Sequence, residues 1–217
     1  MKWKDYTIED LFEKVKTEKI AAKANDFPTT PTEEWSLPLL TAGAENQGLA
    51  RYAKREQCPT ILKNVITISA NGANTGATYY QDKEFAVLQD AYAIKLKDMD
   101  IPSKEVGLFL ASCIGKVLHG NFSWTYKAGW ERIKKLSIKL PVKEADVIDW
   151  DYMQSYIKEL ERERIEELEQ YLVATGLSDY ELTEEDIRNL SLSLVSGVTK
   201  NEIIRLLLSF AKNAKCA

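Results

Sequence analysis

The sequence predicts a mixed α/β domain that is followed by a long, coiled-coil-like α-helix and by short C-terminal helices. Two observations lead to this fold class. All six prolines and eight of the ten glycines lie at or before residue 141, where short apolar and β-branched runs alternate with turn residues. After residue 141 the apolar residues recur at helical spacing among many charges. We therefore expect an α/β region over residues 1–142 and a helical region over residues 143–217.

The α/β region begins with a short helix candidate, Ile8–Lys14, whose apolar residues fall on one side. A second, more apolar helix is expected over Val106–Leu118. The strand candidates are short, apolar or β-branched runs between turn signals, and they are Leu37–Leu40, Asn64–Ala70, Ala77–Tyr80, Phe85–Val87, Ala91–Leu96 and Leu136–Leu140. Loops are expected over residues 24–38, 41–48, 71–76 and 121–127.

The helical region opens at Asp149 or Asp151, either of which can cap a helix that runs to about Thr175. Gly176 ends it, and capping-box patterns predict two further helices near 184–195 and 200–212. One stripe of the long helix follows spacings of three and four residues, and it comprises Met153, Ile157, Leu160, Arg164, Leu168 and Tyr171. A stripe of this kind on a charged helix favours pairing with another helix.

The composition excludes several classes of protein. With 45% hydrophobic residues among 217, the chain can bury a core and is not wholly disordered. No run reaches the roughly 18 apolar residues of a membrane span, and no signal peptide opens the chain. The three cysteines are far apart, which argues against a disulfide framework or a zinc ribbon and favours a reducing, cytoplasmic location. The single histidine argues against a histidine-based metal site, so we expect no metal.

The formal net charge of −4 argues at first against a nucleic-acid partner. The charge is unevenly divided, however. Residues 1–140 hold 20 basic and 17 acidic residues, and residues 141–217 hold 9 and 16, which gives +3 and −7. The acidic excess therefore marks the helical region as a protein-binding part and leaves DNA binding open for the first region.

Catalytic motifs are absent from the sequence: it contains no dinucleotide fingerprint, phosphate-binding P-loop, nucleophile elbow or zinc-protease motif. It also lacks the Asn/Asp-Pro-Pro-aromatic motif of amino-methyltransferases. We therefore expect no catalytic residue and no cofactor. His119 follows an apolar helix and precedes Gly120, which favours a structural or solvated side chain over a phosphate or base contact.

Two loops have compositions suited to ligand contact. The turn Asn71–Gly76 (NGANTG) can cradle a phosphate with its backbone N–H groups, although a plain hairpin turn has the same signature. The loop 121–130 (NFSWTYKAGW) alternates aromatic with polar and basic residues and leads into the basic run Arg132–Lys135. Aromatic faces can stack on bases and cations can bind phosphates, but the same residues can also anchor the loop to the core.

The motifs taken together resemble the DNA-specificity (S) subunits of type I restriction–modification systems and the related type IIB/IIG specificity chains. The resemblance covers about residues 1–185, and each motif in it is degenerate. The matching segments are the start from Trp3 to Phe12, the polar loop 39–48 (LLTAGAENQG), the hairpin 64–80 with Gly72 and Gly76, the strand Gln89–Ile94, and the exit through Leu136–Val142 and Asp149–Ile157 into the long helix.

The resemblance implies a target recognition domain over residues 1–142, and a spacer, dimerisation and partner-docking region over 143–217. It implies a non-catalytic subunit that binds double-stranded DNA and directs an adenine methyltransferase to a bipartite site, with a restriction subunit as a further partner. S-adenosylmethionine is then expected on the methyltransferase. A typical S subunit has two recognition domains and two helices, whereas this chain has room for one of each, so a half-S form is expected. The long helix would pair with a second copy or with the methyltransferase, and no membrane is involved.

A recognition domain reads base edges with amides, hydroxyls and cations. The base-reading candidates are Thr41, Asn46, Gln47, Asn71, Asn74, Thr75, Gln89, Trp124, Tyr126 and Lys127. The phosphate-contact candidates are Arg51, Lys54, Arg55, Arg132, Lys134 and Lys135. Some of these Asn side chains are expected only to satisfy turn backbone.

Two other functions remain open from the sequence. The chain could be a helical interaction or assembly module whose first region binds protein and not DNA. It could also be a small enzyme that uses Asp90 and Glu84, although no spacing in the sequence requires this.

Overall fold

The computed structural model describes residues 1–175, and the two helices expected near 184–195 and 200–212 lie outside the described residues. The chain divides into two compact units, Met1–Glu159 and Leu160–Ala217. No helix within residues 1–175 combines the length and apolar character that a bilayer crossing requires. The predicted mixed α/β fold with a long helix after it is confirmed.

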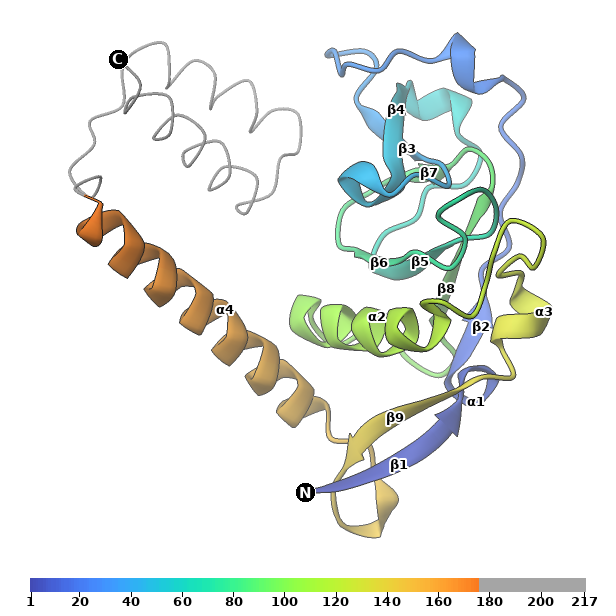
Figure 1. Ribbon diagram of the computed structural model, residues 1–217. Coiled ribbons are helices and arrows are strands. Elements are labelled where there is room, and N and C mark those ends of the chain that lie inside the picture. Colours follow the sequence, from blue (N-terminus) through green and yellow to red (C-terminus); the bar gives the residue numbers. More distant parts are fainter. Residues whose placement is uncertain (176–217) are drawn as a thin grey trace. The chain divides into compact units, whose positions relative to one another are not determined.

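A four-stranded sheet forms the centre of the first unit (Figure 1). Its strand order is β2 (Phe12–Lys14), β8 (Ala91–Leu96), β5 (Val65–Ser69) and β6 (Thr78–Gln81), and every neighbouring pair is antiparallel. All five residues of β5 are buried, which fits a central strand rich in β-branched residues. The sequence therefore places β5, β6 and β8 within one or two residues of their observed bounds.

Helix α2 (Lys104–Leu118) covers this sheet and closes the main core. Ser103 caps its first turn by accepting a hydrogen bond from the Val106 backbone at 3.3 Å. Its buried stripe of Val106, Leu110, Ile114 and Leu118 is at most 1% exposed. The spacing of four residues turns one face of the helix to the sheet, as the sequence predicts.

A second, three-stranded sheet has the order β4 (Leu49–Ala53), β3 (Leu37–Leu40) and β7 (Ala86–Val87). Strand β3 pairs antiparallel with β4 and parallel with β7. Two smaller apolar clusters lie on it, one of which includes Phe27 and Leu39. The strand β4 was not expected from the sequence, because its segment LARYA also fits the end of a polar loop.

Strands β1 (Lys2–Thr7) and β9 (Ser137–Val142) pair antiparallel as a two-stranded ribbon. The prediction of a helix over Ile8–Lys14 is wrong in extent, because the helix α1 ends at Leu11. Phe12 then enters β2, where its backbone joins the central sheet against Leu96 and its side chain is fully buried. Tertiary pairing thus overrides the local helical pattern. The strand β1 and the short helix α3 (Trp130–Ile133) were not anticipated.

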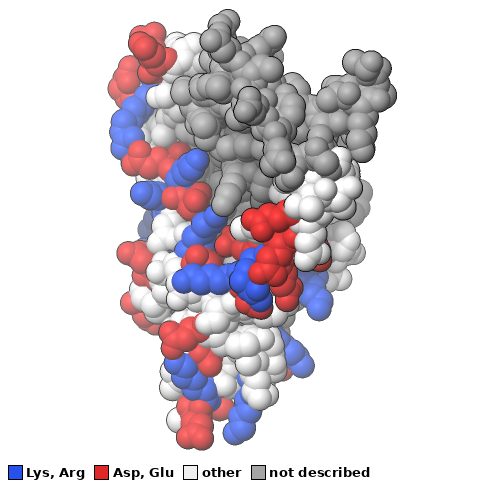
Figure 2. Space-filling model, turned by 90° about the vertical axis from the view of Figure 1, so that its left-hand side faces the viewer, with Lys and Arg blue, Asp and Glu red and all other residues white. Residues whose placement is uncertain are grey.

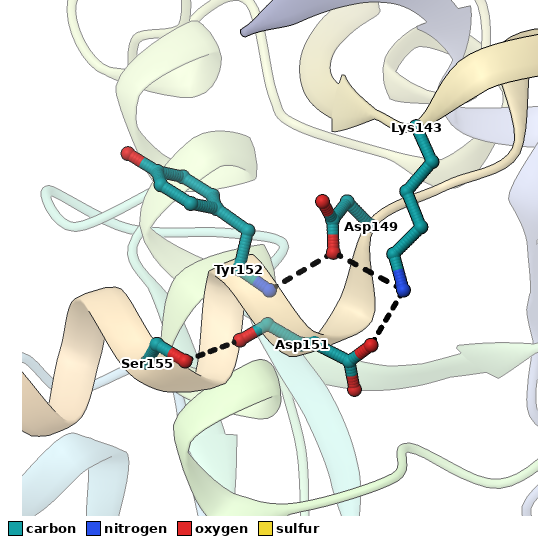
Figure 3. Close-up of polar contacts among 5 residues, drawn as sticks. All are labelled: Lys143, Asp149, Asp151, Tyr152 and Ser155. Carbon is teal, nitrogen blue, oxygen red and sulfur yellow. Dashed lines mark hydrogen bonds and ion pairs between the residues drawn. The ribbon is translucent and has the colours of Figure 1, made fainter.

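The chain leaves β9 through a tight turn and enters helix α4 (Trp150–Ala174) (Figure 3). Asp149 is the capping residue, because its Oδ1 accepts a hydrogen bond from the Tyr152 backbone at 3.0 Å. Asp151, the other expected cap, instead pairs with Lys143, with 2.5 Å between Oδ2 and Nζ. The same Nζ atom lies 3.7 Å from Asp149 Oδ1. The hydrogen bond to Asp151 raises the pKa of Lys143.

Four aromatic rings fix the first turns of α4 against the first unit. Trp3 stacks on Phe109 at 6.5 Å and meets Tyr152 edge to face at 6.3 Å. Tyr156 closes the ring of contacts, because it lies 5.9 Å from both Phe109 and Tyr152. Aromatic pairs in these geometries contribute about 0.5–1.5 kcal/mol each beyond area burial. β1, α2 and α4 are therefore joined by one cluster.

Gly107 allows α2 to approach the sheet closely. A Cβ at this position would lie 2.4 Å from the ring of Tyr80, and the Tyr80 hydroxyl is held by Asn64. We expect Gly107→Ala to lower the free energy of unfolding by about 1–3 kcal/mol through overpacking. Urea unfolding followed by circular dichroism measures the change.

Gly115 on the same helix is the matched control. A Cβ there meets Thr78 at 3.6 Å, which is ordinary contact. Gly115→Ala should therefore leave stability unchanged or raise it by up to about 1 kcal/mol through helix propensity. Equal losses in both variants would contradict the close-approach explanation.

Candidate nucleic-acid interface

The hairpin that joins β5 to β6 is the centre of the candidate interface. Its turn is closed by hydrogen bonds from the Gly76 backbone N–H to Ser69 at 2.8 Å and from Ala77 to Asn74 at 2.9 Å. Gly76 has a φ of +90°, and a Cβ there would lie 3.4 Å from Leu118 at the end of α2. The predicted turn Asn71–Gly76 is therefore a turn, and it lies close against the helix.

The polar loop between β3 and β4 is tied to the same hairpin. The Tyr79 hydroxyl donates to the carbonyl of Ala44 at 3.2 Å. The Gln81 amide donates to the carbonyl of Gln47 at 3.2 Å, and it is only 4% exposed. Both anchors come from β6, so a loop about 35 residues earlier in the chain is held beside the hairpin. No sequence pattern predicts either anchor, since their role depends on the register of β6.

The polar loop also holds an unusual backbone conformation. Asn46 and Gln47 have φ values of +45° and +57°, and Gly48 follows at +85°. A Cβ at Gly48 would lie 2.8 Å from the Thr41 carbonyl, and Thr41 closes the loop through a 2.8 Å backbone bond to Gly48. Asn tolerates left-handed backbone, whereas Gln there is uncommon. Such strain is found at functional sites and is supported by the surrounding structure.

A hollow of about 480 Å³ lies between the polar loop and the hairpin tip. Asn46 lines one side and Asn74 another, and both side chains are otherwise exposed. Its other polar lining residues are Thr29, Tyr52 and the acidic Glu45. Two predicted base-reading amides from loops 28 residues apart therefore open onto the same space.

The aromatic loop 121–129 is fixed to the turn of the hairpin. The backbone N–H of the fully buried Ala128 donates to the Thr75 hydroxyl at 3.0 Å. The carbonyl of Ala128 accepts from the Tyr92 hydroxyl at 2.9 Å, and burial strongly raises the pKa of that phenol. Both polar groups of this buried peptide are therefore satisfied by side chains of the central sheet region.

At the tip of this loop, the aromatic residues Tyr126 and Trp124 have different surroundings. The Tyr126 ring lies between the Phe122 ring, 5.4 Å away and nearly parallel, and the Arg132 guanidinium, 4.4 Å from its centre. Arg132 also donates to the Lys127 carbonyl at 2.8 Å. Trp124 is 67% exposed. The sequence leaves open whether these aromatic residues anchor the loop or are available for ligand contact. In the structure Phe122 packs against the core, whereas Trp124 is available for contact.

Gln89 is followed by Asp90, which makes a further contact with the β5–β6 hairpin. The Asn71 amide donates to the Asp90 carboxylate at 3.0 Å, and the Ala70 backbone donates to the Asp90 carbonyl at 2.8 Å. Asn71 Oδ1 is buried and has no hydrogen-bond partner within residues 1–175. Gln89 is exposed next to this junction.

The structure therefore places three of the predicted reading segments against the fourth, the hairpin turn. Some of their side chains are bonded within the fold and the others are exposed. Thr41, Asn71 and Thr75 bond within the fold, as expected for residues that satisfy turns. The exposed candidates are Asn46, Asn74, Gln89, Trp124, Tyr126 and Lys127, and Gln47 is half-buried.

Most of the phosphate-contact candidates already have partners in the fold. Lys54 pairs with Glu34 and lies over Trp35, and Arg55 makes a two-pronged contact with Glu84 at 2.7 and 3.1 Å. Lys134 pairs with Glu131 at 2.6 Å, which raises its pKa.

The remaining candidates differ from these. Arg51 reaches the Phe27 carbonyl at 3.5 Å, and Arg132 is stacked as described. Lys135 is exposed and has no carboxylate partner among residues 1–175. In the view of Figure 2, basic and acidic side chains are interspersed and form no large patch of one sign.

The carboxylates of the enzyme alternative are also engaged. The hydrogen bond and charge of Arg55 lower the pKa of Glu84, so this group stays ionised and is poorly suited to act as an acid. Asp90 holds Asn71. Within residues 1–175 no three His, Cys, Asp or Glu side chains are grouped as a metal site would require. No observation favours catalysis by these two residues.

The predicted partner stripe of the long helix needs one correction. Met153 is fully buried in the main core, and Ile157 packs against the same core. These two residues therefore belong to the first unit and are not free to meet a partner helix. Farther along, Leu160 and Leu168 are half-buried, while Arg164 and Tyr171 are exposed. Arg164 pairs with Glu167 on its own helix.

Two solved structures share this fold. One is described as the S subunit of a type I restriction–modification system from M. genitalium, with a TM-score of 0.51 and 13% identity over 94% of this chain and 45% of that chain. The other comes from work on complex assembly and conformational transition of the type I restriction–modification system, with a TM-score of 0.53 and 13% identity over 90% and 45%. The chain spans about 45% of the length of both. No curated protein sequence matches it.

The fold presents three polar loops against one hairpin of the central sheet. The sequence profile of the type I restriction modification DNA specificity domain matches residues 1–170. The chain therefore belongs to this family of DNA specificity domains. The resemblance noted in the sequence is confirmed.

The Thr75 hydroxyl provides a direct test of how the aromatic loop is held. Thr75→Val keeps the side-chain volume but removes the acceptor for the buried Ala128 N–H. An unsatisfied buried donor costs about 1–3 kcal/mol, so we expect a fall in unfolding free energy of that size. Urea unfolding measures it, and faster amide exchange at Ala128 should accompany it.

Thr125→Val is the control, because the Thr125 hydroxyl contacts only Ser123 at the exposed tip. Its effect should stay within about 0.5 kcal/mol. If Thr75→Val is as mild as the control, the Thr75–Ala128 bond does not hold the loop.

Proposed function

We propose that this chain is the sequence-reading subunit of a restriction–modification complex. It binds double-stranded DNA and directs a partner adenine methyltransferase, and with it a restriction subunit, to a bipartite site. The observation that carries the proposal is the attachment of three polar loops to the β5–β6 hairpin in a chain of the DNA specificity family. The chain itself is non-catalytic, and S-adenosylmethionine binds on the methyltransferase.

The exposed amides suit direct readout in the major groove. An Asn side chain can donate to and accept from the N6 and N7 positions of adenine, which distinguishes this base from the others. Asn46 and Asn74 open onto one hollow, so both can reach neighbouring base pairs. The anchors from Tyr79 and Thr75 hold the loops in place before DNA arrives, which reduces the ordering cost of binding.

The affinity of this chain for the DNA backbone must be modest when the methyltransferase is absent. The ion pairs of Lys54, Arg55 and Lys134 include exposed carboxylates and contribute only about 0–1 kcal/mol each. A DNA phosphate can therefore replace each carboxylate as the partner of its cation. Each replacement, however, leaves an unpaired carboxylate close to the negatively charged DNA. This balance supports a division of labour in which the methyltransferase supplies much of the positive charge.

Pairing through the distal part of α4 explains how one recognition domain can serve a bipartite site. Past Glu159 the helix carries Leu160 and Leu168 at helical spacing, and Tyr171 is 50% exposed. A second copy that joins here by a two-fold axis reads an inverted half-site. The methyltransferase is the alternative occupant of the same stripe.

The decisive experiment is co-expression of the full chain with the methyltransferase encoded beside it, followed by mapping of methylated adenines. We expect co-purification and methylation at one defined bipartite sequence, and no methylation when either protein is omitted. A complex that binds no DNA at low salt would instead identify an assembly module. Turnover by the purified chain alone would identify an enzyme.

Asn46→Gly sharpens this experiment. Glycine adopts the observed φ of +45° freely, so the variant should keep its stability while losing the amide. We expect relaxed or altered sequence preference at one base pair, with discrimination reduced by about 1–3 kcal/mol. Unchanged preference would remove Asn46 from the reading set without affecting the proposed function.

Substitution in the distal helix tests the pairing. Leu168→Lys places a charge in the stripe, whereas Gln170→Lys adds the same charge at an exposed position two residues away. We expect Leu168→Lys to reduce the assembly mass measured by light scattering, and Gln170→Lys to leave it unchanged. If both variants keep the wild-type mass, the interface lies elsewhere.

A further inference from the structure

The tip of the aromatic loop is a tight, preorganised turn. Ser123 and Tyr126 exchange backbone hydrogen bonds at 2.9 and 3.1 Å, so Trp124 and Thr125 occupy a two-residue turn. The Ser123 hydroxyl accepts a further bond from the Tyr126 backbone at 3.1 Å and lies 3.2 Å from the Thr125 hydroxyl. The turn is therefore fixed by its own polar groups.

The flanks of the turn are equally constrained. Phe122 and Arg132 enclose the Tyr126 ring, and Phe122 packs against the main core. Farther along, Ala128 is bonded through both backbone groups to Thr75 and Tyr92. These contacts use the other two aromatic side chains of residues 121–129 to hold the loop, and they leave Trp124 at its end.

Trp124 is the most exposed tryptophan or tyrosine among the described residues, at 67%. No aromatic partner or cation contacts its ring among residues 1–175. An indole has a single N–H donor and no acceptor, so it cannot form the bidentate contacts that distinguish base pairs. It has a large flat apolar face, which suits stacking on bases or insertion at a base step.

We propose that Trp124 is a stacking wedge. Its indole inserts between two neighbouring base pairs at the edge of the recognised sequence and bends the duplex. This inference rests on the proposed function. It adds a second mode of recognition, because a wedge favours flexible pyrimidine–purine steps by deformability and not by base-edge hydrogen bonds. Lys127, three residues further along, is also exposed and supplies a cation for a phosphate contact near the wedge.

The test uses the full chain with its methyltransferase and a duplex that the wild-type complex selects from a random-sequence pool. Trp124→Ala should weaken binding about tenfold or more, and Trp124→Phe, which keeps a ring, should weaken it by less. Val147→Ala removes an exposed apolar side chain between β9 and α4, outside the candidate reading loops, and is the control, with unchanged affinity expected.

Two further signals distinguish a wedge from other contacts. The selected duplex should quench tryptophan emission in the wild type, and Trp124→Phe, which leaves four of the five tryptophans, should abolish most of that quenching. Energy transfer between dyes on the duplex ends should report a bend that is reduced in Trp124→Ala.

The outcomes separate this inference from the proposed function. Unchanged affinity and bending in Trp124→Ala overturn the wedge while sequence-directed methylation stands. Loss of methyltransferase co-purification in Trp124→Ala, with DNA affinity retained, also overturns it and identifies a protein contact. If the wild-type complex selects no duplex, the proposed function and the wedge both fail.

Discussion

Loops from three distant parts of the chain depend on the β5–β6 hairpin for the hydrogen bonds that their backbones need. The N–H group of the fully buried Ala128 would be left without a protein partner if the Thr75 hydroxyl were not placed opposite it. A buried unpaired backbone group is costly, so the aromatic loop has a strong preference for one position, while the Tyr79 bond to the exposed Ala44 adds a weaker tie for the polar loop. The rigidity of the candidate interface follows from this requirement, and the all-buried strand β5 supplies the fixed reference.

The same arrangement explains how strained backbone is tolerated where it is useful. Asn46 and Gln47 remain in the left-handed region because Gln81 holds the Gln47 carbonyl and Thr41 closes the loop. The side chain of Asn46 is thereby turned outward to the hollow that it shares with Asn74. Preorganised amides lose little conformational freedom on binding, which favours specificity in a domain whose own positive charge is low.

The long helix divides between two tasks along its length. Its first turns belong to the recognition unit, where Met153 is buried and Tyr152 and Tyr156 join the aromatic cluster with Trp3 and Phe109. The Asp149 cap and the Lys143 ion pairs fix the point at which the helix begins. Under the proposed function, only the part beyond Glu159 would be available for pairing. A helix anchored in this way would set the spacing between two reading units on a bipartite site.

The sequence by itself determined the α/β class, the strands β3, β5, β6 and β8, the helix α2 and the long helix α4, because period, composition and capping are local properties. It also indicated the family and the loop segments of the candidate interface. It missed β1 and β4 and extended α1 too far, since those outcomes depend on pairing between distant segments. Which polar side chains face outward was decided only by the tertiary structure. Thr75 and Asn71 bond inward while Asn46 and Trp124 remain exposed, because strand register and the satisfaction of buried groups are set across the whole unit.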